Sequence, residues 1–397
     1  MRVSSNTLFD SNVAAMNQQQ ARLQQTQQQL STGRKLLTAS DDPVAAARAL
    51  EVTQSDAMNT QYASNRDAAR HTLSLAESTL QSVTSLLQDV KTAAINAGNG
   101  TLNSSDRSSI ATNLSGRLEE LIGLANTTDG TGNYLFAGFQ SKTQPFVDTA
   151  AGVGYFGDDG QRNVQVSASR QMPSSNSGAD LFMRIKNGNG TFVTQAAVTN
   201  AGGGAISQGT VLDANALTGN AYSITFTSAT TYDVTNNSTV PVSVVSAGNA
   251  YVSGQAISFG GMQFDIKGAP VSGDSFTVVP SGNESVFSTI SNMISSLNAP
   301  IIGANLSNAL SHGIGQVDRA LDNVLTARSS LGLRMNEIDA LQSAGEDLGL
   351  HFKQTLSQLQ DVDYNQAISN LVRQQTNLQA AQQSFTKVVG LSLFDYM

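Results

Sequence analysis

The feature that most constrains this chain is a heptad repeat of apolar side chains between residues 71 and 98. Apolar residues recur every seven positions on one row and again, three positions later, on a second row. Two such rows form the apolar seam of a helix that packs lengthwise against other helices. The repeat therefore predicts a long helix that ends at Gly98-Asn99-Gly100. The first row is Leu73, Leu80, Leu87 and Ala94, and the second is Ala76, Val83, Val90 and Ala97.

Two more segments carry helical periodicity. Residues 103–126, "NSSDRSSIATNLSGRLEELIGLAN", restart a helix after a short Gly-rich joint, which indicates an antiparallel helical hairpin. Residues 314–338 form another heptad, interrupted once by Arg328, and predict a third rod that closes a bundle. The apolar positions are Ile110, Leu114, Leu118, Leu121 and Ala125 in the former, and Ile314, Val317, Leu321, Val324, Leu331, Met335 and Ile338 in the latter.

The two ends of the chain carry weaker versions of the same pattern. The N-terminal row is Met16, Leu23, Leu30 and Leu37, and the C-terminal row is Ile368, Leu371, Leu378, Phe385 and Val389. The positions that would complete each seam are polar, namely Gln20 and Gln27 at the N-terminus and Gln375 and Gln382 at the C-terminus.

A pair of such half-polar helices buries too little apolar surface to offset the entropy of ordering it. The two rows are therefore predicted to form an assembly interface, disordered in the free chain and helical when identical copies cover it. An ordinary helical layer within one chain is the alternative interpretation.

The middle of the chain differs in kind. Residues 141–285 contain short stretches such as "NVQVS", "YSITF" and "MQFDI" between clusters of Gly, Asn, Ser and Asp, which is typical of antiparallel strands. The predicted fold class is mainly α with an inserted β domain: long coiled-coil-like rods from both chain ends and an outer antiparallel β domain. The expected domains are residues 1–42 with 358–397, residues 43–140 with 286–357, and residues 141–285.

No motif predicts a catalytic, cofactor-binding or metal site, so the chain is not expected to be an enzyme. Residues 152–157 match a GxGxxG pattern, but a strand-like stretch follows where a phosphate site needs a helix. Residues 361–365 open like a calcium loop but lack its Gly and its terminal Glu, so a helix start is predicted there. Asp41 and Asp42 precede Pro43 as helix-capping residues do. The histidines His71, His312 and His351 lack metal-site spacing.

Composition narrows the possible partners. The net charge is −8 and Lys and Arg form no run, so nucleic acid is not an expected partner. The absence of Cys excludes disulfides and thiolate metal sites. No apolar run is long enough to span a bilayer, and the N-terminus lacks the apolar core of a cleavable signal peptide. Membrane association is therefore not expected.

The ends of the chain resemble those of the flagellin superfamily. The resemblance covers residues 1–50, which include "STGRKLL" and "SDDPVAAARAL", then "GNYLFAGFQSKTQPF", and finally "DVDYNQAISNLVRQQTNLQAAQQSFTKVVGLSLFDYM". These forms are similar to those of the hook-filament junction proteins within the superfamily. Filament flagellin usually ends without "LSLFDYM". Residues 260–281, "GGMQFDIKGAPVSGDSFTVVPS", look like segments of hook-associated proteins.

The resemblance implies a structural subunit of the bacterial flagellum, without cofactor, in three concentric layers from inner terminal helices to an outermost β domain. It implies export through the flagellar type III apparatus to an extracellular position at the hook-filament junction. The implied partners are copies of the chain in a lateral ring, hook-associated protein 1 on the hook side, flagellin, and an export chaperone. A filament-forming flagellin and a secreted coiled-coil adhesin or sensor are the alternatives.

Overall fold

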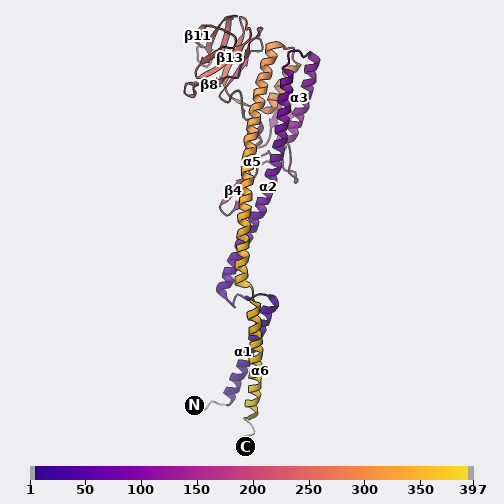
Figure 1. Ribbon diagram of the computed structural model, residues 1–397, viewed down its shortest axis with the longest axis vertical. Coiled ribbons are helices and arrows are strands. Elements are labelled where there is room, and N and C mark those ends of the chain that lie inside the picture. Colours follow the sequence, from indigo (N-terminus) through magenta and orange to yellow (C-terminus); the bar gives the residue numbers. More distant parts are fainter. Residues whose placement is uncertain (1–4, 392–397) are drawn as a thin grey trace. The chain divides into compact units, whose positions relative to one another are not determined.

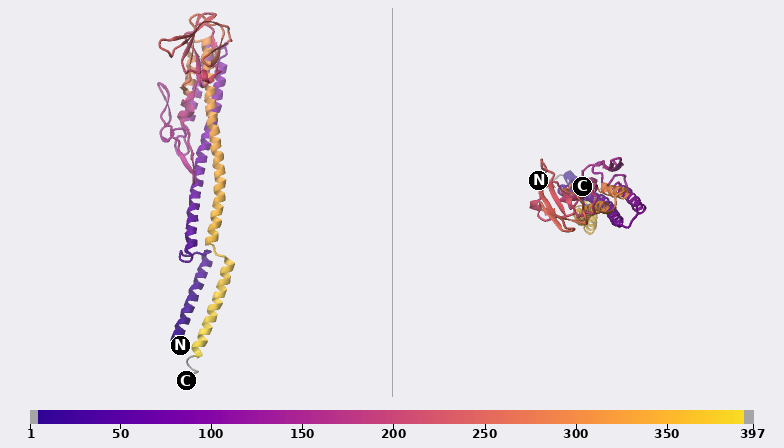
Figure 2. Two further views of the ribbon diagram at one scale, coloured as in Figure 1. Left: turned by 90° about the vertical axis from the view of Figure 1, so that its left-hand side faces the viewer. Right: turned by 90° about the horizontal axis from the view of Figure 1, so that it is seen from above.

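The computed structural model describes residues 5–391, which form helices at both ends of the chain and strands in the middle (Figure 1). Contacts divide the chain into two compact units, Met1–Ser64 with Ala340–Met397, and Asn65–Asp339. In the first unit α1 and α6 lie side by side (Figures 1 and 2). The predicted class, mainly α with an inserted antiparallel β domain, is confirmed. The helices are α1 (Ser5–Thr32), α2 (Pro43–Ala97), α3 (Ser104–Ala125), α4 (Val286–Asn298), α5 (Gly303–Gln360) and α6 (Tyr364–Leu391).

The second unit is built on the two strong heptads. Every residue of the α2 rows from 73 to 97 is buried, and so are Val317, Val324, Leu331 and Ile338 of α5. Arg328, which interrupts the α5 heptad, donates from Nη2 to Glu77 Oε1 on α2 at 2.8 Å. The interruption is therefore an ion pair between two of the packed helices. Helix α3 begins with a capping box in which Asn103 and Asp106 each accept the other's backbone N–H.

Helix α4 was not predicted. It packs against α3 and buries six of its thirteen residues. Phe287 of α4 joins a cluster of buried rings with Phe136, Phe146 and Phe182, whose neighbouring centroids lie 5.2–5.9 Å apart. The residues around Phe146 and Phe182 therefore share a core with the helices, although they belong to the segment expected to form the outer β domain.

The strands form an antiparallel β sandwich and three separate two-stranded pairs. One sheet has the order β11-β10-β9-β14-β6, and the other has β12-β13-β7, with β8 also paired to β13. Buried side chains from both sheets, including Ile224, Phe226, Phe264 and Phe276, form one core. The strands of this sandwich are β6 (Phe192–Ala196), β7 (Ala205–Ile206), β8 (Thr210–Val211), β9 (Tyr222–Ser228), β10 (Thr231–Asn236), β11 (Ser243–Ala250), β12 (Ala256–Phe259), β13 (Met262–Lys267) and β14 (Ser275–Pro280).

The remaining strands form three pairs. The pair β5–β15 marks where the chain enters and leaves the sandwich. The strands are β1 (Phe146–Thr149) with β2 (Gly152–Tyr155), β3 (Asn163–Ser167) with β4 (Arg170–Pro173), and β5 (Ile185–Lys186) with β15 (Asn283–Glu284).

A second row of side chains on α5, spaced three and four residues apart, holds the sandwich. Asn305 Nδ2 donates to the Asn200 carbonyl at 2.8 Å, and Asn308 Nδ2 donates to the Gly204 carbonyl at 3.0 Å. The Asn308 Oδ1 accepts from the Ile206 amide at 3.1 Å. These bonds fix the β6–β7 side of the sandwich against α5. The row is Asn305, Asn308, His312, Gly315 and Arg319.

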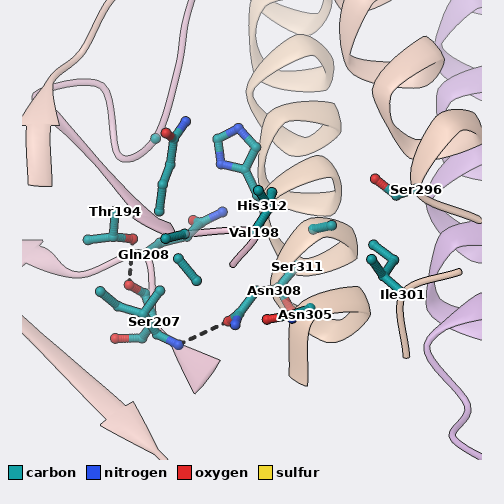
Figure 3. A pocket seen from close by; sticks show the side chains of 16 residues that line it. Thr194, Val198, Ser207, Gln208, Ser296, Ile301, Asn305, Asn308, Ser311 and His312 are labelled. Carbon is teal, nitrogen blue, oxygen red and sulfur yellow. Dashed lines mark hydrogen bonds between the residues drawn. The ribbon is translucent and has the colours of Figure 1, made fainter. Parts of the chain in front are cut away.

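A pocket of about 380 Å³ lies between this row and the sandwich. Figure 3 shows Asn308 and His312 of α5 facing Ser207 and Gln208 across it. His312 Nε2 lies 3.8 Å from Glu284 Oε2. Burial by itself would raise the pKa of Glu284, but hydrogen bonds from His312 and other side chains outweigh burial and lower it. The pocket is lined by neutral side chains and this histidine, and two of its four side-chain amides, those of Asn305 and Asn308, already bond to the backbone.

We expect Leu80→Asp to lower the free energy of unfolding by about 3 to 5 kcal/mol, because it buries an unpaired charge in a fully packed position. Leu80 is 0% exposed, whereas Ile95 on the same helix is 55% exposed. Ile95→Asp is the matched control and should cost less than about 1 kcal/mol. Denaturant unfolding of the purified variants measures both values. Equal losses would contradict the assignment of the heptad to the core.

We expect a chain in which a short Gly-Ser linker replaces residues 188–281 to keep its helical fold. Its ends would be joined beside the β5–β15 ladder, where the Asn187 amide donates to the Gly282 carbonyl at 3.1 Å. Circular dichroism should show a cooperative thermal transition. A longer deletion, residues 142–281, also removes Phe146 and Phe182 and should lose that transition. Identical behaviour of the two deletions would contradict the shared aromatic core.

Candidate assembly interface

All the predicted assembly residues except Leu37 lie on α1 and α6, which pair antiparallel in the first unit. Phe9 and Phe385 stack with centroids 5.2 Å apart at one end of the pair. At the other end, Arg34 and Asp361 form an isolated antiparallel bridge. The Val362 amide donates to the carbonyl of Gly33, which has a φ of 71° and ends α1. The two helices therefore pair within one copy from Phe9 and Phe385 at one end to Arg34 and Asp361 at the other.

Carboxylates cap the turns beside this pair, as predicted. Asp41 Oδ2 accepts from the amides of Leu37 and Thr38, and these backbone bonds lower the pKa of Asp41. Asp42 Oδ1 accepts from the Ala45 amide at the start of α2. Asp363 Oδ1 accepts from the amides of Asn365 and Gln366 at the start of α6. The calcium-like motif is thus a helix start.

On α1 the seam follows the predicted row but has different polar positions. Met16, Leu23 and Leu30 are half-buried, and Leu37 lies beyond the helix in the turn before α2. Gln20 and Gln27 are exposed, which corrects the expectation that they complete the seam. The structure uses Gln19 and Thr26 instead, because the seam advances from each apolar residue by three positions and then by four.

On α6 the positions that complete the seam also differ from the predicted ones. Leu371, Leu378 and Phe385 are half-buried, but Ile368 is 50% exposed and contributes little to the seam. Gln375 and Gln382 are exposed. The side chain of Val389 lies outside the residues whose side chains the structure describes. The positions that complete the α6 seam are Ala367, Gln374 and Ala381.

Two layers of this seam are polar. Thr26 Oγ1 donates to Gln374 Oε1 at 3.0 Å, and Thr26 is the one α1 side chain described as buried. Gln19 Oε1 is buried and has no hydrogen-bond partner among the described residues. Gln19 also lines a hollow of about 210 Å³ between the helices, with Met16 and Phe385. The seam is therefore weaker than one with apolar side chains in every layer.

Helix α6 also presents an apolar row outside the seam. Tyr364, Ile368 and Val372 follow one another at a spacing of four residues and are 50–56% exposed. Phe9 on α1 is 48% exposed. Residues four apart lie on one face of a helix, so Tyr364, Ile368 and Val372 form a continuous strip on α6. Ile368 was predicted in the seam but lies in this strip, whose signal in the sequence is the i, i+4 spacing of the three side chains.

The remaining motifs have structural explanations. Residues 152–155 form β2, which pairs with β1, so the GxGxxG stretch lies in a hairpin. His71 and His351 lie on α2 and α5, and His312 faces the pocket described above. Within the described range, no three His, Cys, Asp or Glu residues gather in a metal-binding arrangement. No helix in that range has the length and apolarity required to cross a membrane.

Family models match most of the chain. The bacterial flagellin N-terminal helical region matches residues 3–141, and the bacterial flagellin C-terminal helical region matches residues 314–397. The D2-like domain of flagellar hook-associated protein 1 matches residues 195–280. Together with the fold and the paired terminal helices, these matches define the class as a flagellin-like protein of the bacterial flagellum.

Full-length relatives narrow the class. Flagellar hook-associated protein 3 of Salmonella typhimurium is 31% identical and that of Escherichia coli 30% identical, each over 99% of both chains. FlgL of Xanthomonas campestris has a TM-score of 0.72 at 32% identity, covering 77% of this chain and 99% of that chain. The flagellar junction protein FlgL of Legionella pneumophila has a TM-score of 0.69 at 31% identity, covering 79% and 100%. The chain belongs to the flagellar hook-associated protein 3 family and is a structural protein of the hook-filament junction.

We expect the polar layer to set how firmly α1 and α6 hold together. Thr26→Val alone removes the donor to Gln374 Oε1 and should speed amide hydrogen exchange in both helices. Thr26→Val with Gln374→Leu replaces both partners by apolar side chains and should slow exchange below that of the unmodified chain. Gln27→Leu, at an exposed position, is the control and should leave exchange unchanged. Faster exchange in the double variant would contradict this account of the seam.

Proposed function

We propose that this protein forms the adaptor layer between hook-associated protein 1 at the end of the hook and the flagellin filament. Copies assemble side by side into a ring through α1 and α6. The protein reaches its extracellular position through the flagellar export apparatus, and an export chaperone holds the C-terminal helix before export. The role is mechanical and uses neither catalysis nor a cofactor.

The observation that carries the assembly proposal is the α1–α6 pair itself. Its seam contains a polar layer at Thr26, and the buried Gln19 Oε1 has no hydrogen-bond partner among the described residues. Outside the seam, Ile368 and Val372 belong to an exposed apolar strip. Neighbouring copies would bury this strip and supply the surface that the pair lacks. The predicted interface residues Met16, Leu23, Leu30, Leu37, Ile368, Leu371, Leu378, Phe385 and Val389 are retained as part of this proposal.

The proposed assembly has three layers. We propose α1 and α6 as the inner layer and residues 187–282 as the outer β domain. The remaining residues, including the aromatic cluster around Phe146 and Phe182, form the helical layer between them. The match of the D2-like model to residues 195–280 supports the revised outer boundary.

Two other functions fit the chain less well. A filament-forming flagellin would polymerise alone into long tubes, whereas an adaptor adds only to an existing end. A secreted adhesin would not need matched half-polar helices at both chain ends. The full-length similarity to hook-associated protein 3 supports the adaptor.

We expect Leu378→Asp to abolish attachment to isolated hooks that carry hook-associated protein 1, while leaving the thermal midpoint of the free protein almost unchanged. Leu378 lies in the weak seam, so the introduced carboxylate should be buried mainly when neighbouring copies pack around the helices. Attachment is measured in vitro by electron microscopy with purified subunits, which excludes effects on the chaperone. Leu378→Met, which keeps the apolar contact, is the control and should attach normally.

A midpoint lowered as much as by Leu80→Asp would show that the terminal helices are already firmly packed in the free chain. That result would contradict the proposed role of the α1–α6 seam, even if attachment were lost.

A further inference from the structure

We infer that strand β11 presents a contact surface to a neighbouring copy of this chain in the assembled junction. The inference rests on the proposed function, since it requires several copies to stand side by side. It assigns a role to the outer β domain, which the terminal-helix interface leaves without one.

The surface is a row of exposed valines on and around β11. None of the eight residues of β11 is buried. Val244 and Val245, which point to opposite faces of the strand, are 64% and 47% exposed. Val240, Val242 and Val252 continue the row at 99%, 58% and 59% exposure. Single exposed valines need no explanation, but five exposed valines within residues 240–252 make the surface of this edge strand apolar, which is typical of an interaction site.

The position of β11 makes this surface accessible. β11 is the edge strand of its sheet, and β6 is the strand at the opposite edge. The β6–β7 side is occupied by α5, through the bonds from Asn305 and Asn308. Figure 1 shows β11 on the side of the sandwich away from α5. The strand that carries these valines therefore lies away from α5.

The edge geometry favours packing of side chains over the addition of another strand. The pairing of β11 with β10 shifts register on both sides of Val234, and the Gly248 amide donates to Asp233 Oδ1 at 2.6 Å. Such bulges twist an edge and interrupt the regular ladder that an added strand needs. Pro241, just before the strand, lacks a backbone donor. The partner would thus cover the valines without extending the sheet.

The charge distribution favours a second copy as the occupant. Residues 234–264 contain no Asp, Glu, Lys, Arg or His, although 13% of the whole chain is charged. Each copy carries a net charge of −8, so identical copies repel wherever their charged surfaces approach. An uncharged apolar face avoids this penalty, whereas a strongly charged partner would find no complementary group there.

The experiment uses a fluorescent label on β11, because the chain has no native cysteine. Val244→Cys in the full chain is labelled with acrylodan, a dye whose emission shifts to the blue when water is excluded. Val198→Cys is the matched control, since Val198 is 84% exposed and follows β6 at the opposite edge of the same sheet. Each labelled protein is titrated onto isolated hooks carrying hook-associated protein 1, without flagellin, and bound protein is counted by electron microscopy.

We expect a blue shift at position 244 that grows as occupancy of the hook ends rises, and no shift at position 198. Loss of full occupancy by the labelled Val244→Cys protein, when it still binds hook ends at low occupancy and the labelled control fills them, would also support a contact between copies at β11. A full shift at low occupancy would show that the hook-side protein covers the strand, and would overturn the inference. Normal attachment with no shift would overturn it and leave the adaptor function intact. Failure of the unlabelled chain to attach would overturn both.

Discussion

The second unit depends on the two rows of side chains that α5 carries on different faces. The apolar row, with Val317, Val324 and Leu331, packs into the helical core and excludes water almost completely. The second row, with Asn305 and Asn308, donates hydrogen bonds to backbone carbonyls of the β domain. Burial of the apolar row supplies most of the stability, because a hydrogen bond adds only about 1 kcal/mol net. The hydrogen bonds are directional, so the second row determines where the sandwich is seated.

The sequence predicted the apolar row of α5 but not the second row, and the reason is physical. Apolar side chains that share a core reveal themselves by periodicity alone, and even Arg328 was visible as an interruption. The second row bonds to the backbone of residues more than a hundred positions away, and backbone carbonyls leave no pattern in the side-chain sequence. Helix α4 is short and follows a run of strands, so it carries no long repeat. Its signal was nevertheless present, because Val286, Ile290, Met293 and Leu297 recur at helical spacing after the capping residue Ser285.

At the candidate interface the sequence predicted the helices and the apolar rows but not the polar positions that complete them. Met16, Leu23 and Leu30 fix the spacing of seven, but the complementary position can lie three or four residues further on. An apolar side chain at one of these two positions would have shown which of them lies in the seam. Both choices are polar in this chain, Gln19 or Gln20 and Thr26 or Gln27, so only the packed helices distinguish them. The same ambiguity placed Ile368 in the seam, although the structure exposes it.

The polar layers give the terminal helices a property that an assembling protein needs. A seam of apolar side chains in every layer would hold α1 to α6 so firmly that neighbouring copies could add little. The Thr26–Gln374 bond can be exchanged for bonds to water or to another copy at small net cost, because both sides of the exchange are hydrogen-bonded. The bond also specifies how the two helices align, because it forms only in the register that places Thr26 opposite Gln374. The same two side chains therefore weaken the pair and, while their bond is intact, specify its alignment.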